Sequence, residues 1–384
     1  MTVRTPTVAL ERLAGYDDPD GVAAAVRNAL GPLGGMERFV KPGMRVVIKP
    51  NLLFGRAPER ALNTHPEIVR AVGKLVREAG AGEIMIGDSP GFGSARGAAK
   101  ICGILPVAEE LGAKFVEFTP VENIDPKRAF PRLELARELL AADLVVNLPK
   151  MKTHGQMLMT LAVKNMFGAV PGTRKFQWHY RAGRDKIVFA RMLNDIALAV
   201  RPGLSILDAV LSMDGMGPSA GRPRRTGFIA AADDPWALDA AVMDVLGLER
   251  TLLFTLREAD ERGLRGWRDA AVVGERPEDL RPGEWDVPEL VGAQMHGTFI
   301  EKRLPGVAKW LRARISPPPG PNSRCIRCGY CVDICPAGAM RMEAGVVVDA
   351  DACIRCYCCH ELCRYDGMDL PRPGLLSRIL GFGG

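Results

Sequence analysis

The chain has 384 residues, enough for two or three domains, and with 47% hydrophobic and 25% charged residues it has the composition of an ordinary globular protein. The formal net charge of +6 is spread along the chain and aromatic residues make up only 6%, so we expect no nucleic-acid partner. No apolar run approaches the roughly 18 residues that a membrane-spanning helix needs. The first residues also lack a signal-peptide pattern, so we expect no membrane span and a cytoplasmic location.

From Arg45 onward, short apolar runs alternate with helical patterns, which predicts an α/β domain with a mostly parallel sheet and flanking helices. Strands are predicted at 46–48, 84–86, 114–118, 144–148, 204–207 and 228–231, with weaker strand patterns at 252–256 and 270–273. Helices are predicted at 65–80, from the glycine-rich turn at 87–93 to 111, and at 156–167, 185–200 and 234–247. The segments 119–135 and 214–225 are predicted to be irregular.

Composition also suggests where the domains divide. We predict an α/β domain of one or two lobes at 1–316, a proline-rich linker at 317–321, a small cysteine-rich domain at 322–370 and a tail at 371–384. A basic amphipathic connector at 297–314 is expected to pack on the α/β domain, and 375–380 is predicted to be a short apolar helix. The linker would then fold the small domain back over the α/β domain.

Eight cysteines near the end of the chain follow the spacing C-x2-C-x2-C-x3-C twice, beginning at Cys325 and at Cys353. This is the spacing of bacterial-type ferredoxin domains with two [4Fe–4S] clusters, in which the fourth cysteine of each run binds the other cluster. We therefore assign to the first cluster Cys325, Cys328, Cys331 and Cys363. To the second cluster we assign Cys353, Cys356, Cys359 and Cys335. Disulfides do not suit a reducing compartment, and zinc sites prefer separated C-x2-C pairs.

Three further residues in this region need an interpretation. Cys358 is a ninth thiol beside Cys359, and we expect it to be packed without binding a cluster. His360 is expected to tune a cluster rather than do chemistry. Arg364 stands where the second run would usually carry proline.

Polar side chains follow five of the predicted strands at their carboxyl ends, where open α/β sheets bind ligands. We therefore predict that they line a single cleft. The expected substrate-binding residues are Lys49, Asn51, Asp88, Ser89, Asn147, Asn165 and Asp208. The expected catalytic residues are Lys150, Lys152, His154, Lys164 and His179. The lysines would neutralise an anion, and a histidine would supply a proton because imidazole titrates near neutral pH.

Simpler structural interpretations stay open for several of these residues. The stretch 87–91 could be only a tight turn, and the lysines could form a solvated helix face. His65 could be a ligand or the N-cap of the helix that follows it. Neither a P-loop nor a convincing dinucleotide fingerprint is present, so NAD is not expected.

Five motifs carry a resemblance to a known family: V-I-K-P-N-L at 47–52, G-D-S-P-G at 87–91, N-L-P-K-M-K-T-H at 147–154, K-N-M-F-G-A-V-P-G at 164–172 and M-D-G-M-G-P at 213–218. They resemble the family catalogued as domain of unknown function 362, whose members are often fused to a C-terminal two-cluster ferredoxin domain. The resemblance implies an α/β domain with distant similarity to the nickel-pincer lactate racemase fold. No metal ligand of the racemase can be matched residue by residue, so none is carried over.

Three hypotheses on function follow, and whether the chain is an enzyme stays open among them. The first is a reductase-type enzyme that acts on an anionic small molecule in the cleft, with electrons fed through two [4Fe–4S] clusters from a ferredoxin or reductase partner. The second is an electron carrier or assembly factor whose α/β domain docks a partner protein. The third is a racemase-like enzyme without redox chemistry, whose clusters are structural. The substrate, the electron donor and any further metal or flavin are not determined by the sequence.

Overall fold

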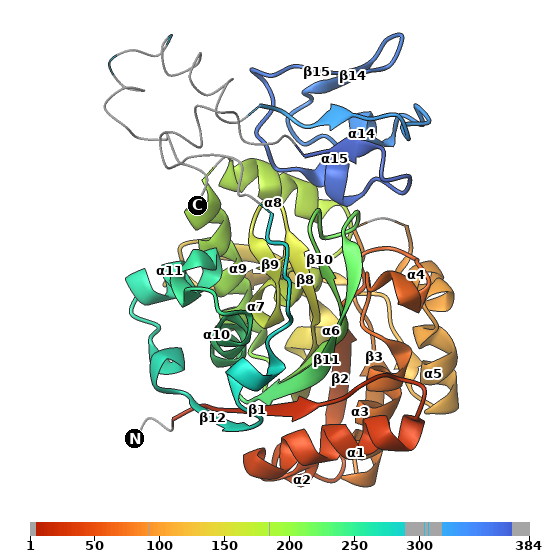
Figure 1. Ribbon diagram of the computed structural model, residues 1–384, viewed down its shortest axis with the longest axis vertical. Coiled ribbons are helices and arrows are strands. Elements are labelled where there is room, and N and C mark those ends of the chain that lie inside the picture. Colours follow the sequence, from red (N-terminus) through yellow and green to blue (C-terminus); the bar gives the residue numbers. More distant parts are fainter. Residues whose placement is uncertain are drawn as a thin grey trace.

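The computed structural model describes residues 5–91, 93–183, 185–288, 303, 306 and 317–370 (Figure 1). Its centre is a ten-stranded mixed sheet whose main path runs in the order β12-β1-β11-β10-β7-β2-β3-β4. The strands of this sheet are β1 (Thr7–Arg12), β2 (Arg45–Pro50), β3 (Glu83–Ile86), β4 (Lys114–Phe115), β7 (Leu144–Leu148), β8 (Lys150–His154), β9 (Leu158–Thr160), β10 (Leu204–Asp214), β11 (Arg222–Ala232) and β12 (Ala271–Gly274). The five neighbours from β10 to β4 are parallel, which confirms the mostly parallel sheet.

Helices cover both faces of the sheet because the buried strands present apolar side chains to both sides. In β2, Val46 and Ile48 pack in the core shared with α1 and α3, whereas Val47 packs in the core shared with α9. The longer helices are α1 (Pro19–Leu30), α3 (Pro66–Glu78), α4 (Ala95–Ile101), α5 (Ile104–Glu110), α8 (Arg174–Ala182), α9 (Lys186–Val200), α10 (Pro235–Leu246) and α11 (Phe254–Glu261). Shorter ones are α2 (Met36–Phe39), α6 (Arg137–Leu140), α7 (Ala162–Asn165) and 3-10 turns at Gly31–Leu33, Pro58–Arg60, Met166–Ala169, Arg250–Leu252, Gly266–Asp269 and Pro277–Leu280.

Four predicted segments differ from the structure. Residues 119–135, predicted to be irregular, contain the antiparallel pair β5 (Pro120–Ile124) and β6 (Arg132–Ala136). The weak strand pattern at 252–256 is wrong, because α11 begins at Phe254. The excursion at 214–225 is shorter than predicted, since β10 and β11 continue as a hairpin arm to the pair Asp214 and Arg222.

The fourth difference is the predicted helix at 156–167, which is a strand, β9, followed by the short helix α7. The first two backbone N–H groups of α7, those of Ala162 and Val163, donate to the carboxylate of Asp239 at 2.7 and 3.2 Å. Asp239 lies in α10, so this helix takes its N-terminal partner from a distant part of the chain. A local pattern could not have placed its start.

The C-terminal part forms a small module, residues 317–370, with β13 (Gly320–Pro321), α14 (Tyr330–Asp333), β14 (Met340–Met342), β15 (Val346–Val348), α15 (Cys358–Glu361) and β16 (Met368–Asp369). Gly320 and Pro321, within the predicted linker, already pair with β16. The module sits on the end of the α/β domain formed by α8 and the β10–β11 arm (Figure 1). The predicted connector at 297–314, apart from Arg303 and Gly306, and the predicted helix at 375–380 lie outside the described residues.

Candidate functional site: a lysine-rich pocket beneath the cluster module

The cysteines of the first predicted set share one cavity of about 160 Å³, lined by Cys325, Cys328, Cys331 and Cys363 together with Cys359. The backbone N–H of Gly367 donates to the sulfur of Cys363 at 3.1 Å, a kind of contact that tunes iron–sulfur clusters. These soft donors around one cavity fit a [4Fe–4S] cluster.

The second predicted set gathers around the buried Cys359. Burial raises the pKa of the Cys359 thiol well above its ordinary value, and Cys356, Cys353, Cys331 of the first set, and Cys335 add to the shift. The backbone N–H of Ala339 donates to the sulfur of Cys335 at 3.3 Å. Thiols that crowd one another in this way are costly as free groups and suit a shared metal centre.

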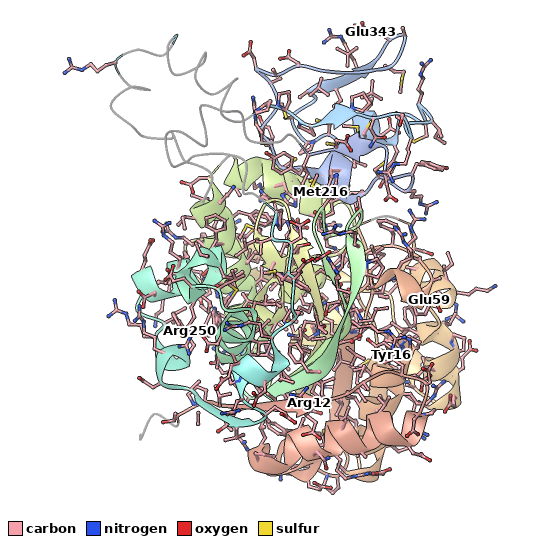
Figure 2. The ribbon with its side chains drawn as sticks, viewed as in Figure 1. Arg12, Tyr16, Glu59, Met216, Arg250 and Glu343 are labelled. Atoms are coloured by element: carbon pink, nitrogen blue, oxygen red, sulfur yellow. The ribbon has the colours of Figure 1, made fainter. Side chains whose placement is uncertain are left out.

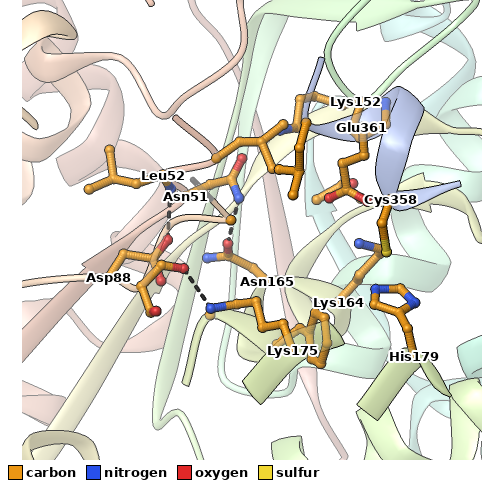
Figure 3. Close-up of a pocket in the computed structure, with 18 of the residues that line it drawn as sticks. Asn51, Leu52, Asp88, Lys152, Lys164, Asn165, Lys175, His179, Cys358 and Glu361 are labelled. Atoms are coloured by element: carbon orange, nitrogen blue, oxygen red, sulfur yellow. Dashed lines mark hydrogen bonds between the residues drawn. The ribbon is translucent and has the colours of Figure 1, made fainter. Parts of the chain in front are cut away.

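A second cavity, of about 60 Å³, lies between the α/β domain and the module (Figure 3). Its floor comes from the ends of β2 and β3, and its sides from β8, β9, α7 and α8. Its polar lining is Asn51, Asp88, Ser89, Lys152, Thr160, Lys164, Asn165, Lys175, His179, Cys358 and Glu361. Cys358 and Glu361 belong to α15, so the module itself forms one wall of this pocket.

Several contacts hold the module in this position. The ring Nε2 of His360 lies 3.1 Å from the carbonyl oxygen of Met216, at the tip of the β10–β11 arm (Figure 2). Arg60 and Asp366 form an ion pair at 3.6 Å. Leu362 packs so closely on Gly91 that a Cβ there would lie 2.5 Å from it. The expectation that the module folds back over the cleft is therefore confirmed.

The wall of the pocket opposite the module rests on a buried ion pair. Lys49 Nζ lies 2.8 Å from Asp88 Oδ1, and both side chains are almost fully buried. The other carboxylate oxygen of Asp88 accepts a hydrogen bond from the backbone N–H of Leu52 at 2.7 Å. The backbone of Gly168 packs directly against this pair, so a Cβ at residue 168 would lie 2.0 Å from Asp88 Oδ1. Lys49 thus supports the site through Asp88 and does not line the cavity.

Three further lysines enter the pocket, and their surroundings differ. Lys152 donates to the carbonyl of Leu62 at 2.7 Å, and Lys175 donates to the carbonyls of Ser89 and Val170 at 2.8 and 2.6 Å. Among the described residues, none lies within hydrogen-bond or ion-pair distance of Lys164 Nζ. Figure 3 shows its side chain running toward Cys358 and the ring of His179.

Burial and mutual repulsion bring the lysine pKa values down. Burial, with Lys164 nearby, lowers the pKa of Lys152 to about 7. Burial also lowers the pKa of Lys175 to about 7, opposed by Asp88, and that of Lys164, opposed by Glu361. Burial alone would raise the pKa of Glu361, but Lys164 lowers it well below its ordinary value, so Glu361 stays an anion. Lys152 and Lys175 are therefore cations at pH below about 7, and Glu361 is an anion beside them.

Burial changes the protonation expected of the two histidines that the sequence proposed as proton donors. Burial lowers the pKa of His154 to about 4 and that of His179 to about 3, so both rings are neutral near pH 7. His154 Nδ1 accepts hydrogen bonds from the N–H groups of Gln156 and Met157 at 3.1 and 3.3 Å, which leaves its hydrogen on Nε2. That Nε2 points to Glu361 at 3.4 Å. The lysines with a pKa of about 7 are better placed to exchange a proton.

Three asparagines form a chain of hydrogen bonds behind and into the pocket. Asn51 Nδ2 donates to Asn165 Oδ1 at 3.0 Å, and Asn165 Nδ2 donates to Asn147 Oδ1 at 2.8 Å. Asn147 Nδ2 donates in turn to the carbonyl of Ala162 at 3.1 Å and to Ser205 Oγ at 3.2 Å. Asn51 and Asn165 line the cavity, whereas Asn147 lies behind them and supports Asn165.

Lys150 and Asp208 do not share this pocket, which corrects the prediction of a single cleft for all the polar strand ends. Their side chains pair at 2.8 Å, and Asp208 also accepts hydrogen bonds from Tyr16 Oη at 2.5 Å and from the N–H of His65 at 2.8 Å. Tyr16 lies well below the cluster module (Figure 2). The His65 ring accepts from the N–H of Glu67 at 3.2 Å, which confirms its N-cap interpretation. This satisfied network ties β8 and β10 to the start of α3.

Four polar lining residues were not among the predicted site residues: Thr160, Lys175, Cys358 and Glu361. Lys175 and Thr160 lie near the motifs at 164–172 and 147–154, but no residue pattern around them indicates a site. Cys358 is buried as predicted, yet its side chain faces the pocket. Glu361 could have been recognised from the sequence, because it is an acidic residue between the cluster cysteines Cys359 and Cys363.

Comparisons with known proteins support the family and the cysteine-rich domain. A family model described as "Domain of unknown function (DUF362)" matches residues 46–244, and one described as "4Fe-4S binding domain" matches residues 322–341. A thylakoid-associated protein of Synechocystis sp. is 43% identical over 286 residues, which cover 74% of this chain and 88% of that protein. None of the helices in the described ranges has the length and apolarity needed to cross a bilayer.

Two solved structures are also similar, and this chain spans about half the length of each. One is a Thermotoga maritima protein, with 14% identity, 55% of each chain covered and a TM-score of 0.35. The other is the lactate racemase apoprotein of Thermoanaerobacterium thermosaccharolyticum, with 12% identity, 54% of this chain and 51% of that chain covered, and a TM-score of 0.35. From the family match and the Synechocystis relative, the chain belongs to the DUF362 family and carries a 4Fe–4S ferredoxin-type domain at its C-terminal end.

Proposed function

We propose that this chain is an oxidoreductase that reduces a small anion in the lysine-rich pocket, with electrons supplied through two [4Fe–4S] clusters. The observation that carries the proposal is the position of α15, which forms one wall of the pocket while contributing Cys359 to the cluster module. Leu362 lines both the pocket and the cavity of the first cysteine set. A ligand in the pocket would thus lie within one residue of both predicted cluster sites.

The size and charge of the pocket suggest the class of substrate. A cavity of about 60 Å³ holds on the order of four to six water-sized groups, if each occupies about 10–15 Å³. The ammonium group of the buried Lys164 would bind the negative charge of such a ligand. A small oxyanion or short carboxylate fits these limits.

The chemistry is divided between the two parts of the chain. When bound, the clusters would store and pass single electrons. The electrons would come from a redox partner of the ferredoxin or reductase type, and each negative charge gained by the ligand would be offset by a proton from Lys152 or Lys175, whose pKa values are about 7. Glu361 would hold Lys164 in its cationic form. We also propose a cytoplasmic location, because cluster-binding thiols need a reducing compartment.

The test uses anaerobically purified holoprotein whose clusters have been reduced with dithionite. A panel of small oxyanions and short carboxylates is added, and reoxidation of the clusters is followed by absorbance and electron paramagnetic resonance. We expect at least one anion to reoxidise the clusters, and Lys164→Met to abolish this while both clusters remain reducible. Lys127→Met, a change at an exposed lysine, is the matched control.

Two outcomes would contradict the proposal. One is a Lys164→Met protein that reoxidises as fast as the unmodified protein. The other is a protein that passes electrons to a redox protein but to none of the anions, which would favour the electron-carrier hypothesis.

A further inference from the structure

The chain of asparagines has a fixed direction, which decides what it presents to the pocket. The carbonyl of Ala162 can only accept a hydrogen bond, so the group of Asn147 that faces it at 3.1 Å must be the NH2 group. The oxygen of Asn147 therefore faces Asn165, which must donate its own NH2 group to it. By the same step Asn165 offers its oxygen to Asn51, which donates its NH2 group. None of the three side-chain amides can be reversed without placing two donors or two acceptors together.

The end of this chain is an acceptor without a partner. Asn51 Oδ1 is buried and makes no hydrogen bond with any of the described residues. Two other polar atoms that line the same pocket are also buried and unpartnered in the described structure, Thr160 Oγ1 and His179 Nδ1. Thr160 and His179 are each more than nine-tenths buried. Buried polar atoms are normally paired, so this group of three points to a ligand.

Lys164 and Asn51 would bind different chemical groups of one small molecule. Lys164 needs a negatively charged oxygen, whereas Asn51 Oδ1 needs a hydrogen-bond donor. Resting on the function proposed above, we infer that the pocket selects an oxyanion that retains a proton, such as bicarbonate, and discriminates against anions that carry no O–H group. Asn51 is then the residue that determines this specificity, and Asn165 and Asn147 hold its amide in place.

The reason for discrimination is the cost of an unpaired group. An anion without a donor would place one of its oxygens against the buried Asn51 Oδ1, so two acceptors would face each other and Asn51 Oδ1 would stay unpaired. Sites built to hydrogen-bond a ligand O–H reject analogues that lack it far more strongly than apolar sites reject a change in size. Thr160 can donate or accept, so its hydroxyl suits either kind of anion and adds no discrimination.

Two matched pairs of anions test the inference on the anaerobic holoprotein by isothermal titration calorimetry. Bicarbonate and nitrate are both planar monoanions, but only bicarbonate carries an O–H group. Phosphate and sulfate are both tetrahedral, and only phosphate retains a proton near neutral pH. We expect the protonated member of at least one pair to bind at least tenfold more tightly, and the pair that shows it identifies the ligand as trigonal or tetrahedral.

Variants assign the effect to a residue. Asn51→Ala should bring the preference within a pair close to one, whereas Asn28→Ala, at an exposed asparagine, should leave it unchanged. Lys164→Met should weaken both members of a pair together and keep their ratio. Iron content and thermal denaturation of each variant show whether it has folded.

The outcomes separate this inference from the proposed function. If the members of both pairs bind equally to the unmodified protein, or if Asn51→Ala keeps the preference, the inference is wrong. Reoxidation of reduced clusters by an anion would still support the proposed function in that case. If no anion binds and none reoxidises the clusters, both are wrong.

Discussion

The close contact of Gly168 with the Lys49–Asp88 ion pair gives a prediction whose size can be worked from the structure. In Gly168→Ala the new Cβ would lie 2.0 Å from Asp88 Oδ1 and 2.5 Å from Lys49 Nζ, whereas real contacts of this kind essentially never fall below 3.0 Å. The carboxylate must therefore move by about 1 Å, away from an ion pair of 2.8 Å and from its 2.7 Å hydrogen bond with the N–H of Leu52. Breaking a buried pair costs about 3–5 kcal/mol.

We therefore expect Gly168→Ala to lower the free energy of unfolding by about 3–5 kcal/mol, a large part of the 5–15 kcal/mol typical of a domain. The measurement is urea unfolding of the anaerobic protein followed by far-ultraviolet circular dichroism. Gly266→Ala is the matched control, because Gly266 also lies in a 3-10 turn and a Cβ there would meet nothing within 4 Å.

The same substitution in a protein that lacks the ion pair shows whether the pair causes the loss of stability. In a Lys49→Leu/Asp88→Ala protein the space beside residue 168 is open, so adding Gly168→Ala should cost less than about 1 kcal/mol. A loss below about 1 kcal/mol in the unmodified background would refute the reasoning. So would an equal loss in both backgrounds, which would indicate backbone strain at residue 168 itself.

Three further predictions concern the clusters, the pocket and the module. Cys358→Ser should keep about eight irons per chain by chemical analysis, whereas Cys331→Ser should lose about four, because only Cys331 is assigned to a cluster; loss of iron in Cys358→Ser would overturn the assignment. The affinity for bicarbonate should fall as pH rises from about 7 to 9, by at least tenfold, because Lys152 with its pKa of about 7 is a cation below that pH and neutral above it. Lys152→Met should reduce this dependence in calorimetric titrations and leave the part due to Lys175, whose pKa is also about 7, and an unchanged slope would exclude Lys152 as a titrating group. Gly91→Val should push Leu362 away and open the module, with faster proteolysis of the module and a lower anion affinity, and a variant with neither change would show that this contact does not hold the module in place.

The sequence by itself determined the parts of this protein that depend on short-range patterns. The spacing from Cys325 to Cys363 predicted a ferredoxin-type domain, since three of the four ligands to each cluster follow each other closely along the chain. Continuous apolar runs such as 144–146 predicted buried parallel strands, because those strands pack on both faces. The strand-end rule brought Asn51, Asp88 and Lys152 to one site.

Tertiary structure decided which polar strand ends belong together. Lys150 and Lys152 are two residues apart in β8 and would share a face in a regular strand. Their partners in β10, however, are Asp208 and Met213, which lie five positions apart across an irregular register. Lys150 is therefore drawn to Asp208 and away from the pocket, and only the long-range pairing of the two strands fixes this.

The sequence also could not predict the protonation states of the pocket residues or the wall that α15 of the module forms. His154 and His179 have the residue type of a proton donor, but full burial among cations lowers their pKa values to about 4 and 3. Glu361 reaches Lys164 only because the module folds back onto α8 and the β10–β11 arm. Burial and long-range contacts are properties of the folded chain, and no local pattern of residues encodes them.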